Sequence, residues 1–437
     1  MKHTRRVHSH PANEFIRCMD MTGASARRPV HLSSRAIDIL SDIRRDIQSA
    51  KSELLPETGH SASGHSASGH SASGHSASGH SASGHSASGH SASIRLVELK
   101  RTGDYANIPE NIRRYVDSHP PIYCRTFVAV IRGTRVDVHF YLFDARDKRK
   151  LDEWAAMAGE WLDVALRQPA KPGCSARNSV AVHFLMTPLE KYVPADRTEL
   201  VAEKHVNTAF TYSCIPSNRI VIFRREDWFK TFIHETFHCL GFDFSKNDGA
   251  RTAKLANARV LRMFAGCAPD MDVRIYESYC ETWAQILNLL FMSSGKPGLA
   301  QFRRDFATDR AFVFFQMQKF LAIYGLSYAR LRSGATDPKY REGTNVFAYF
   351  VLRSGLIWNL NGFLEWTATH NVAAASAAYS LVFDDAKIGS FVDLIQSSHR
   401  TPAFIAAAKL TETAVLPLAS SKCSNKTRRT FRMTAFE

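Results

Sequence analysis

The chain has 437 residues, of which 45% are hydrophobic, and it carries a formal net charge of +15. This length and apolar content predict a globular protein with a sizeable core, and they exclude a wholly disordered chain. The eight cysteines are scattered without a CxxC pair, which excludes a dense disulfide scaffold and favours a reducing, intracellular compartment.

Targeting and membrane segments are not indicated. The first 30 residues are rich in arginine but lack the apolar run of a secretory signal. The most apolar windows, residues 311–329 and 346–366, are interrupted by Lys319 and Arg353 and have helical periodicity. We therefore expect buried helices and no membrane span.

The two ends of the chain are basic. Residues 1–58 are predicted to form a basic arm that contains one amphipathic helix, at residues 34–55, with Ile39, Ile43 and Ile47 on one stripe. This helix could dock on the main domain or on a partner. Residues 406–437 are predicted to form a basic tail. Solvated tails are the simplest interpretation of both ends, and non-specific contact with polyanions is the alternative.

A repeat separates the arm from the rest. The pentapeptide Gly-His-Ser-Ala-Ser occurs without a break over residues 59–93, with a histidine at every fifth position from His60 to His90. Such a composition cannot bury enough apolar surface to offset chain entropy, which predicts a flexible linker without a preorganised metal site.

Residues 94–405 are predicted to form one α+β domain. Two alternating runs, 125–131 and 135–143, flank Gly133 as in a hairpin, and an amphipathic helix at 151–166 follows. Three short β-type runs come next, and the pattern from Glu226 onward is almost wholly helical. The three runs cover residues 180–186, 209–213 and 219–223.

An HExxH motif carries the chemistry. It lies in a stretch of helical periodicity, residues 227–241, that ends at Gly241, a residue suited to a left-handed cap. His234 and His238 are four residues apart and hence on one helix face, where both rings can reach one metal ion. Glu235 lies beside them, where it could take a proton from a metal-bound water.

A catalytic zinc ion needs a third protein ligand and an open fourth position. The helix-patterned residues 273–290 place Glu277 and Glu281 four apart on an otherwise apolar face. Buried carboxylates of this kind are costly unless they meet a cation. Spacing alone does not decide which of the two is the ligand.

These motifs resemble the gluzincin branch of zincin metallopeptidases, in which HExxH on one helix is completed by a glutamate from a following helix. The resemblance implies a zincin-like fold, a Zn²⁺ ion held by His234, His238 and Glu277, and Glu281 as the acid that orients an imidazole. The metzincin variant would need His or Asp six residues after His238. Phe244 stands there, and Asp243 is one residue short.

More narrowly, residues 224–245 and 276–284 look like uncharacterised zincin-like proteins of large DNA viruses of protists. The likeness covers roughly residues 180–365, including Thr344 to Phe350. It implies the fold and the metal site, with no established substrate, and a location in the host cytoplasm or the virion.

The resulting hypothesis is a zinc metalloendopeptidase that cleaves a polypeptide substrate, with Glu235 as general base. Four residues could stabilise the oxyanion, and Tyr276 is taken as the catalytic candidate although the sequence does not rank them. They are Tyr276, Tyr279, His205 and Tyr349. The run 219–223 is expected near the sheet edge that binds the substrate as an added strand.

Two other classes remain. The first is an inactive protein in which zinc staples two helices, and Cys239 and Cys280 beside the motifs keep it open. The second is a basic packaging or virion protein that binds nucleic acid through its ends, for which no recognition motif is present.

Overall fold

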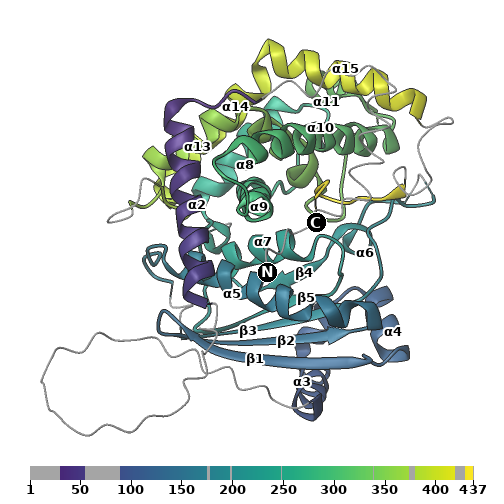
Figure 1. The fold of residues 1–437 in the computed structure, drawn as a ribbon. Helices are drawn as coiled ribbons and strands as arrows, with labels where there is room; N and C mark the ends of the chain where they lie inside the picture. The colour runs from purple at the N-terminus through teal and green to yellow at the C-terminus, as the bar shows by residue number, and fades with distance from the viewer. Residues whose placement is uncertain are drawn as a thin grey trace, which may run out of the picture.

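The computed structural model describes residues 30–54, 89–174, 178–196, 199–247, 249–337, 339–373, 379–418 and 429–436. The predictions for the arginine-rich start, for most of the repeat and for Lys422, Lys426 and Arg428 fall outside these residues. Within them the fold is α+β, as predicted, with a mixed sheet at one end and a helical half at the other (Figure 1).

The sheet has five strands in the order β1-β2-β3-β5-β4. The β1/β2 and β5/β4 pairs are antiparallel, whereas β2, β3 and β5 run parallel. Arg132 (φ 48°) and Gly133 (φ 80°) connect β1 to β2 with positive φ at both positions, as a tight hairpin turn requires. The predicted hairpin is confirmed. The strands are β1 (Tyr123–Ile131), β2 (Thr134–Leu142), β3 (Ser179–Met186), β4 (Ala209–Thr211) and β5 (Ser217–Ile222).

The inner face of the sheet packs on helices α5 (Leu151–Leu166) and α7 (Trp228–Leu240), both close to their predicted bounds. Strand side chains alternate between the two faces, so Phe140 and Phe184 point inward and their rings meet Trp228. This aromatic layer fixes α7 against the sheet.

The outer face is covered by helices that the sequence reading missed. Helices α3 (Gly89–Arg101) and α4 (Glu110–Ser118), with the 3₁₀ turn η1 (Gly103–Asn107), stand between the repeat and β1. Leu96 and Ile112 from these helices pack on the outer face. The predicted linker bound at residue 93 is therefore wrong, because α3 begins within the last copy of the repeat.

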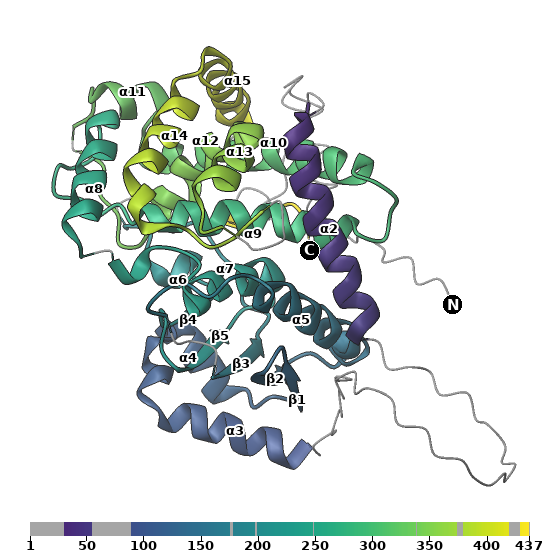
Figure 2. The ribbon, with the colours of Figure 1, turned by 90° about the vertical axis from the view of Figure 1, so that its left-hand side faces the viewer.

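The second half of the domain is helical, as predicted from the pattern after Glu226. Its long central helix α9 (Ile275–Ser293) lies between α7 and α10 (Figure 2). The remaining elements are η2 (Ala145–Lys150), α6 (Glu203–Val206), η3 (Ser245–Asn247), α8 (Arg251–Met263), α10 (Ala300–Ile323), α11 (Tyr328–Ser333), the π-helical turn η4 (Ala348–Leu352), α12 (Arg353–Trp358), α13 (Leu360–His370), η5 (Asp385–Lys387) and α14 (Ile388–Arg400).

No bilayer-spanning helix occurs among the described residues, since none joins sufficient length to sufficient apolarity. The windows 311–329 and 346–366 instead contribute buried helices, as expected.

Helix α2 (Ser34–Leu54) is part of the main body. Its stripe of Ile39, Ile43 and Ile47 is fully buried against α5, α9 and α13, and Ser33 before it donates to Glu365 of α13 at 2.6 Å. The sequence allows this helix to dock on the main domain or on a partner, and the structure shows it docked on the main domain. It does not belong to a separate arm.

The predicted solvated tail over residues 406–437 is also corrected. Helix α15 (Pro402–Leu418) packs on α10 and α14, and residues 430–436 are all buried. Arg432, expected in solvent, is only 4% exposed. It can be buried because it forms an ion pair with the buried Asp227.

The sequence did not indicate one cysteine pair. Cys174 and Cys214 form a disulfide that connects the segment after α5 to the loop between β4 and β5. The other described cysteines are buried and form no disulfide.

Two stacked histidines lie on the outer face of the sheet. His139 of β2 and His183 of β3 are register partners with ring centroids 4.7 Å apart, and Thr126 meets His139 Nδ1 at 2.9 Å. Burial lowers the pKa of His139 to about 4, and burial followed by the charge of His139 lowers that of His183. Both rings are therefore neutral at pH 7 in the folded chain.

This pair predicts a loss of stability in mild acid. In the unfolded chain His139 becomes protonated below about pH 6.5, whereas in the folded chain it stays neutral down to about pH 4. The free energy of unfolding therefore falls as the pH falls through this window, by roughly 2–3 kcal/mol for this residue. Urea unfolding between pH 7 and pH 4.5 should show a shallower decline for His139→Gln than for wild type. The exposed His119→Gln should follow wild type, and equal slopes for all three would contradict the prediction.

Candidate metal centre

Helix α7 is the platform of the site. Its last turn ends at Gly241 in the left-handed conformation (φ 68°), whose N–H bonds back to His238 O. A Cβ at Gly241 would collide with the Cys174–Cys214 disulfide, so this position requires glycine on two grounds. Trp161 of α5 donates to Thr236 at 3.0 Å and fixes the rotation of the helix.

The structure brings three predicted residues together. His234 Nε2 and His238 Nε2 are 3.0 Å apart, and Glu277 Oε2 lies 3.0 Å from the first and 3.4 Å from the second. All three side chains are buried, and each offers one atom to the same point. Two neighbouring helices, α7 and α9, supply them.

A carboxylate faces the other nitrogen of each ring. Glu281 Oε1 lies 3.0 Å from His234 Nδ1, and Asp243 Oδ2 is hydrogen-bonded to His238 Nδ1. Ser245 holds Asp243 in place by donating its backbone N–H and its hydroxyl to Oδ1. Carboxylates in these positions fix the tautomer and the orientation of both rings, so that each Nε2 points at the common centre.

The two glutamates of α9 have different surroundings. Glu281 Oε2 forms ion pairs with Lys230 and with Arg353, the latter at 2.8 Å. Glu277 Oε1 accepts from the neutral amide of Asn345 at 2.9 Å, which leaves Oε2 toward the two histidines. Glu277 is therefore the glutamate that lies with the two Nε2 atoms, and Glu281 lies behind the ring of His234.

Opposite charges dominate the electrostatics of the cluster. Burial alone would lower the pKa of His234, but Glu277 and Glu281 outweigh it and raise this pKa to about 9. Burial opposes the shift at Glu277 as well, yet the two histidines lower its pKa to about 2. Each group is buried in the charged form because the opposite charge is in contact with it.

The residues fit a zinc ion. Metal–ligand bonds of about 2.0–2.2 Å in a tetrahedral arrangement place ligand atoms about 3.3–3.6 Å apart, close to the 3.0–3.4 Å found among the three atoms. Within the described structure Glu277 Oε2 is buried and receives no well-directed hydrogen bond, although two ring nitrogens lie next to it. An oxygen that points at two Nε2 atoms in this way is suited to a shared cation.

Glu235 lies on the same helix between the two histidines and is 8% exposed. No hydrogen bond or ion pair to its carboxylate occurs among the described residues. Burial raises its pKa, and the nearby histidines partly oppose this. An unpartnered carboxylate with a raised pKa beside the centre is suited to proton transfer.

The structure separates the four oxyanion candidates. Tyr279 donates its hydroxyl to Leu381 O at 3.0 Å and is fully buried, and His205 accepts from Ala202 N in the loop before α6. Neither has a described contact with the three converging residues. Tyr276 meets the His238 ring edge-on at 5.7 Å, and Tyr349 meets the His234 ring at 6.1 Å. Both tyrosines thus border the centre.

Cysteine ligation receives limited support. Cys280 Sγ lies 3.9 Å from His238 Nδ1 and 3.3 Å from Asp243 Oδ2, so these three residues form a second cluster. This second cluster lies on the Nδ1 side of the His238 ring, where Asp243 already forms a hydrogen bond with His238. Cys239 interacts with Thr211 of β4.

The run 219–223 lies near one edge of the sheet, as expected. Strand β5, which covers most of the run 219–223, lies inside the sheet between β3 and β4. The strand at this edge is the short β4, which pairs antiparallel with β5 and contacts α7, and β1 forms the opposite edge.

Two supporting residues were missed from the sequence. The sequence indicates Asp243 only as a metal ligand one residue short of the metzincin position, and Asn345 only as part of the stretch 344–350. Asp243 does carry a signal, because it is an acid between Phe242 and Phe244 and is therefore expected to be buried with a partner. Asn345 has no such signal, since its contact with Glu277 spans 68 residues.

Comparison of the chain with protein-family models, with curated proteins and with solved structures finds no match.

Proposed function

We propose that this protein is a zinc-dependent peptidase of the gluzincin type. His234, His238 and Glu277 hold the ion in this proposal, and Glu235 is the general base. The observation that carries it is the convergence of three side-chain atoms, two of which belong to imidazole rings that are each oriented by a carboxylate on Nδ1. The resemblance of the two motifs to the gluzincin pattern supports the same reading.

When bound, zinc would supply a Lewis acid that acidifies a water molecule and polarises a carbonyl group. The chain's own residues do the rest. Glu235 accepts a proton at its carboxylate and returns it to the leaving amine. Tyr276, beside the His238 ring, or Tyr349, beside the His234 ring, would donate a hydrogen bond to the developing oxyanion.

A polypeptide substrate is supported by the sheet edge. Strand β4 borders the sheet and contacts α7, and an extended peptide could pair with its outer edge through main-chain hydrogen bonds. Binding of this kind has little sequence preference. Arg432 is buried and therefore cannot contribute to the proposed contact with polyanions. That contact would involve the other basic residues of the two ends.

Replacing the proposed base should separate catalysis from metal binding. Glu235→Gln keeps the shape of the side chain and removes the proton acceptor. Cleavage of a denatured protein mixture should therefore fall about 10²–10⁴-fold while zinc stoichiometry stays at that of wild type. Glu153→Gln, at an exposed position on α5, is the control and should retain full activity. Wild type that binds zinc but cleaves nothing would instead favour the inactive, zinc-stapled protein.

Replacing a ligand or its support should weaken zinc binding to different degrees. Asp243→Asn is nearly isosteric and removes the charge behind His238, so we expect zinc affinity to fall about 10–100-fold. Glu277→Gln removes a proposed ligand and should lower zinc affinity more than Asp243→Asn does. Competition with a chromogenic chelator measures both. Wild-type affinity in the two variants would rule out this centre.

A further inference from the structure

The last described segment of the chain, residues 429–436, is held like a bound peptide. Figure 1 draws it in yellow in the interior, near α7 and α10, and every residue from 430 to 436 is buried. This burial is unusual for a stretch that forms no helix longer than a turn and pairs with no strand of the sheet. Its backbone polar groups therefore need other partners.

Buried side chains of the domain supply those partners. The amides of Met433 and Ala435 donate to Asp227 and Asp309, both at 2.7 Å. Long polar side chains from three helices donate to the carbonyls. These contacts run from Lys319 to Thr430 O, from Gln316 to Arg432 O, from Arg353 to Met433 O and from Asn288 to Phe436 O. The domain thus forms hydrogen bonds with both the amides and the carbonyls of the segment's backbone.

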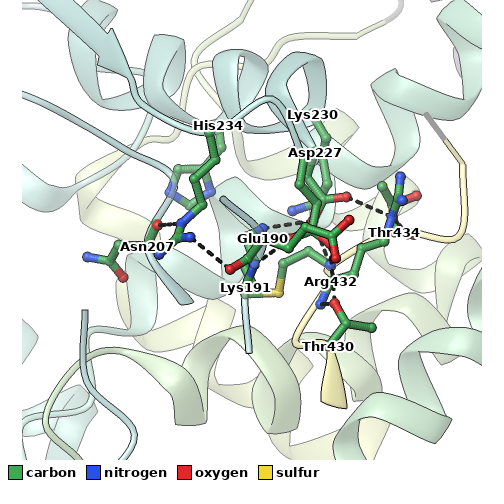
Figure 3. A network of polar contacts seen from close by, with 12 residues as sticks. Glu190, Lys191, Asn207, Asp227, Lys230, His234, Thr430, Arg432 and Thr434 are labelled. Atoms are coloured by element: carbon green, nitrogen blue, oxygen red, sulfur yellow. Dashed lines mark hydrogen bonds and ion pairs between the residues drawn. The ribbon is translucent and has the colours of Figure 1, made fainter. Parts of the chain in front are cut away.

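Two side chains of the segment act as anchors. The ring of Phe431 is fully buried and lies 5.5 Å from that of Phe350. Arg432 Nε lies 3.3 Å from Asp227 Oδ1, and Lys191 pairs with the other oxygen of Asp227 at 2.7 Å (Figure 3). The ion pair with Asp227 offsets the cost of burying the Arg432 guanidinium.

The segment is connected to the metal centre by two routes. Asp227, which it contacts, is the residue immediately before α7 and has φ 57°. Arg353 donates to Met433 O on one side and to Glu281 Oε2 on the other, and Glu281 faces His234 Nδ1. Removing the segment would take Arg432 away from Asp227 and the carbonyl of Met433 away from Arg353. Both changes lie next to residues that support His234.

We propose that residues 429–436 are an intramolecular peptide ligand, and that their docking sets the position of Glu281 and of the start of α7. The metal centre is then complete only while this segment occupies its site. A peptide of the same sequence supplied in trans should serve equally well. The inference rests on the proposed function only where zinc is the readout.

The test uses the full chain with a protease recognition sequence substituted within residues 419–428, cut after folding. A labelled synthetic peptide covering residues 427–437 is then exchanged into the cut chain, and its affinity is measured by fluorescence anisotropy. Arg432→Ala in the peptide should weaken binding about 100-fold or more, because it removes the ion pair that Arg432 forms with the buried Asp227. Arg429→Ala, at an exposed position, should bind like the wild-type peptide.

The effect on the centre is measured in the same samples. Zinc affinity should fall at least ten-fold when the peptide is removed and should recover when it is restored. The NMR signals of the His234 ring should shift with peptide occupancy, and this readout needs no metal. The substitutions Arg432→Ala and Arg429→Ala in the uncut chain repeat the comparison without removing the segment.

The inference would be overturned if the two peptide variants bound with equal affinity. It would also be overturned if zinc affinity and the His234 signals did not change with peptide occupancy. A full chain that binds no zinc at all would defeat the proposed function. In that case peptide affinity and the His234 signals would still decide the present inference.

Discussion

The constraint on which the site depends is that each buried imidazole of α7 has a carboxylate behind it. Glu281 faces His234 Nδ1 and Asp243 faces His238 Nδ1, which directs both Nε2 atoms at Glu277. Burying carboxylates on this scale costs several kcal/mol per ion unless opposite charge and hydrogen bonds accompany them. The packing of α7 on α9 is therefore fixed by charge as much as by the apolar residues around it.

That requirement extends outward through the helical half. Glu281 also pairs with Lys230 and Arg353, and Arg353 reaches the backbone of the last segment at Met433. The same segment brings Arg432 to the buried Asp227 at the start of α7. Arg432 is thus buried beside an acid that immediately precedes α7, and this ion pair links two regions more than 200 positions apart.

Local patterns carried most of the correct predictions. Periodicity and Gly241 defined α7, Gly133 defined the hairpin, and the spacing of Glu277 and Glu281 brought both to the correct face. The errors share a physical cause. The buried partner of Arg432 and the disulfide between Cys174 and Cys214 depend on contacts between distant segments, and such contacts leave no periodic trace in the sequence.

The choice between the two glutamates illustrates where sequence reasoning stops. Spacing gives Glu277 and Glu281 equal claims, but their neighbours do not. The negative charge of Glu281 is shared between Lys230 and Arg353, and these two cations would repel a metal ion placed beside it. Glu277 meets only the neutral amide of Asn345 on its other oxygen, so its charge remains available to a cation. The electrostatic surroundings, supplied by residues 51 and 72 positions from Glu281, thus favour the same ligand as the geometry.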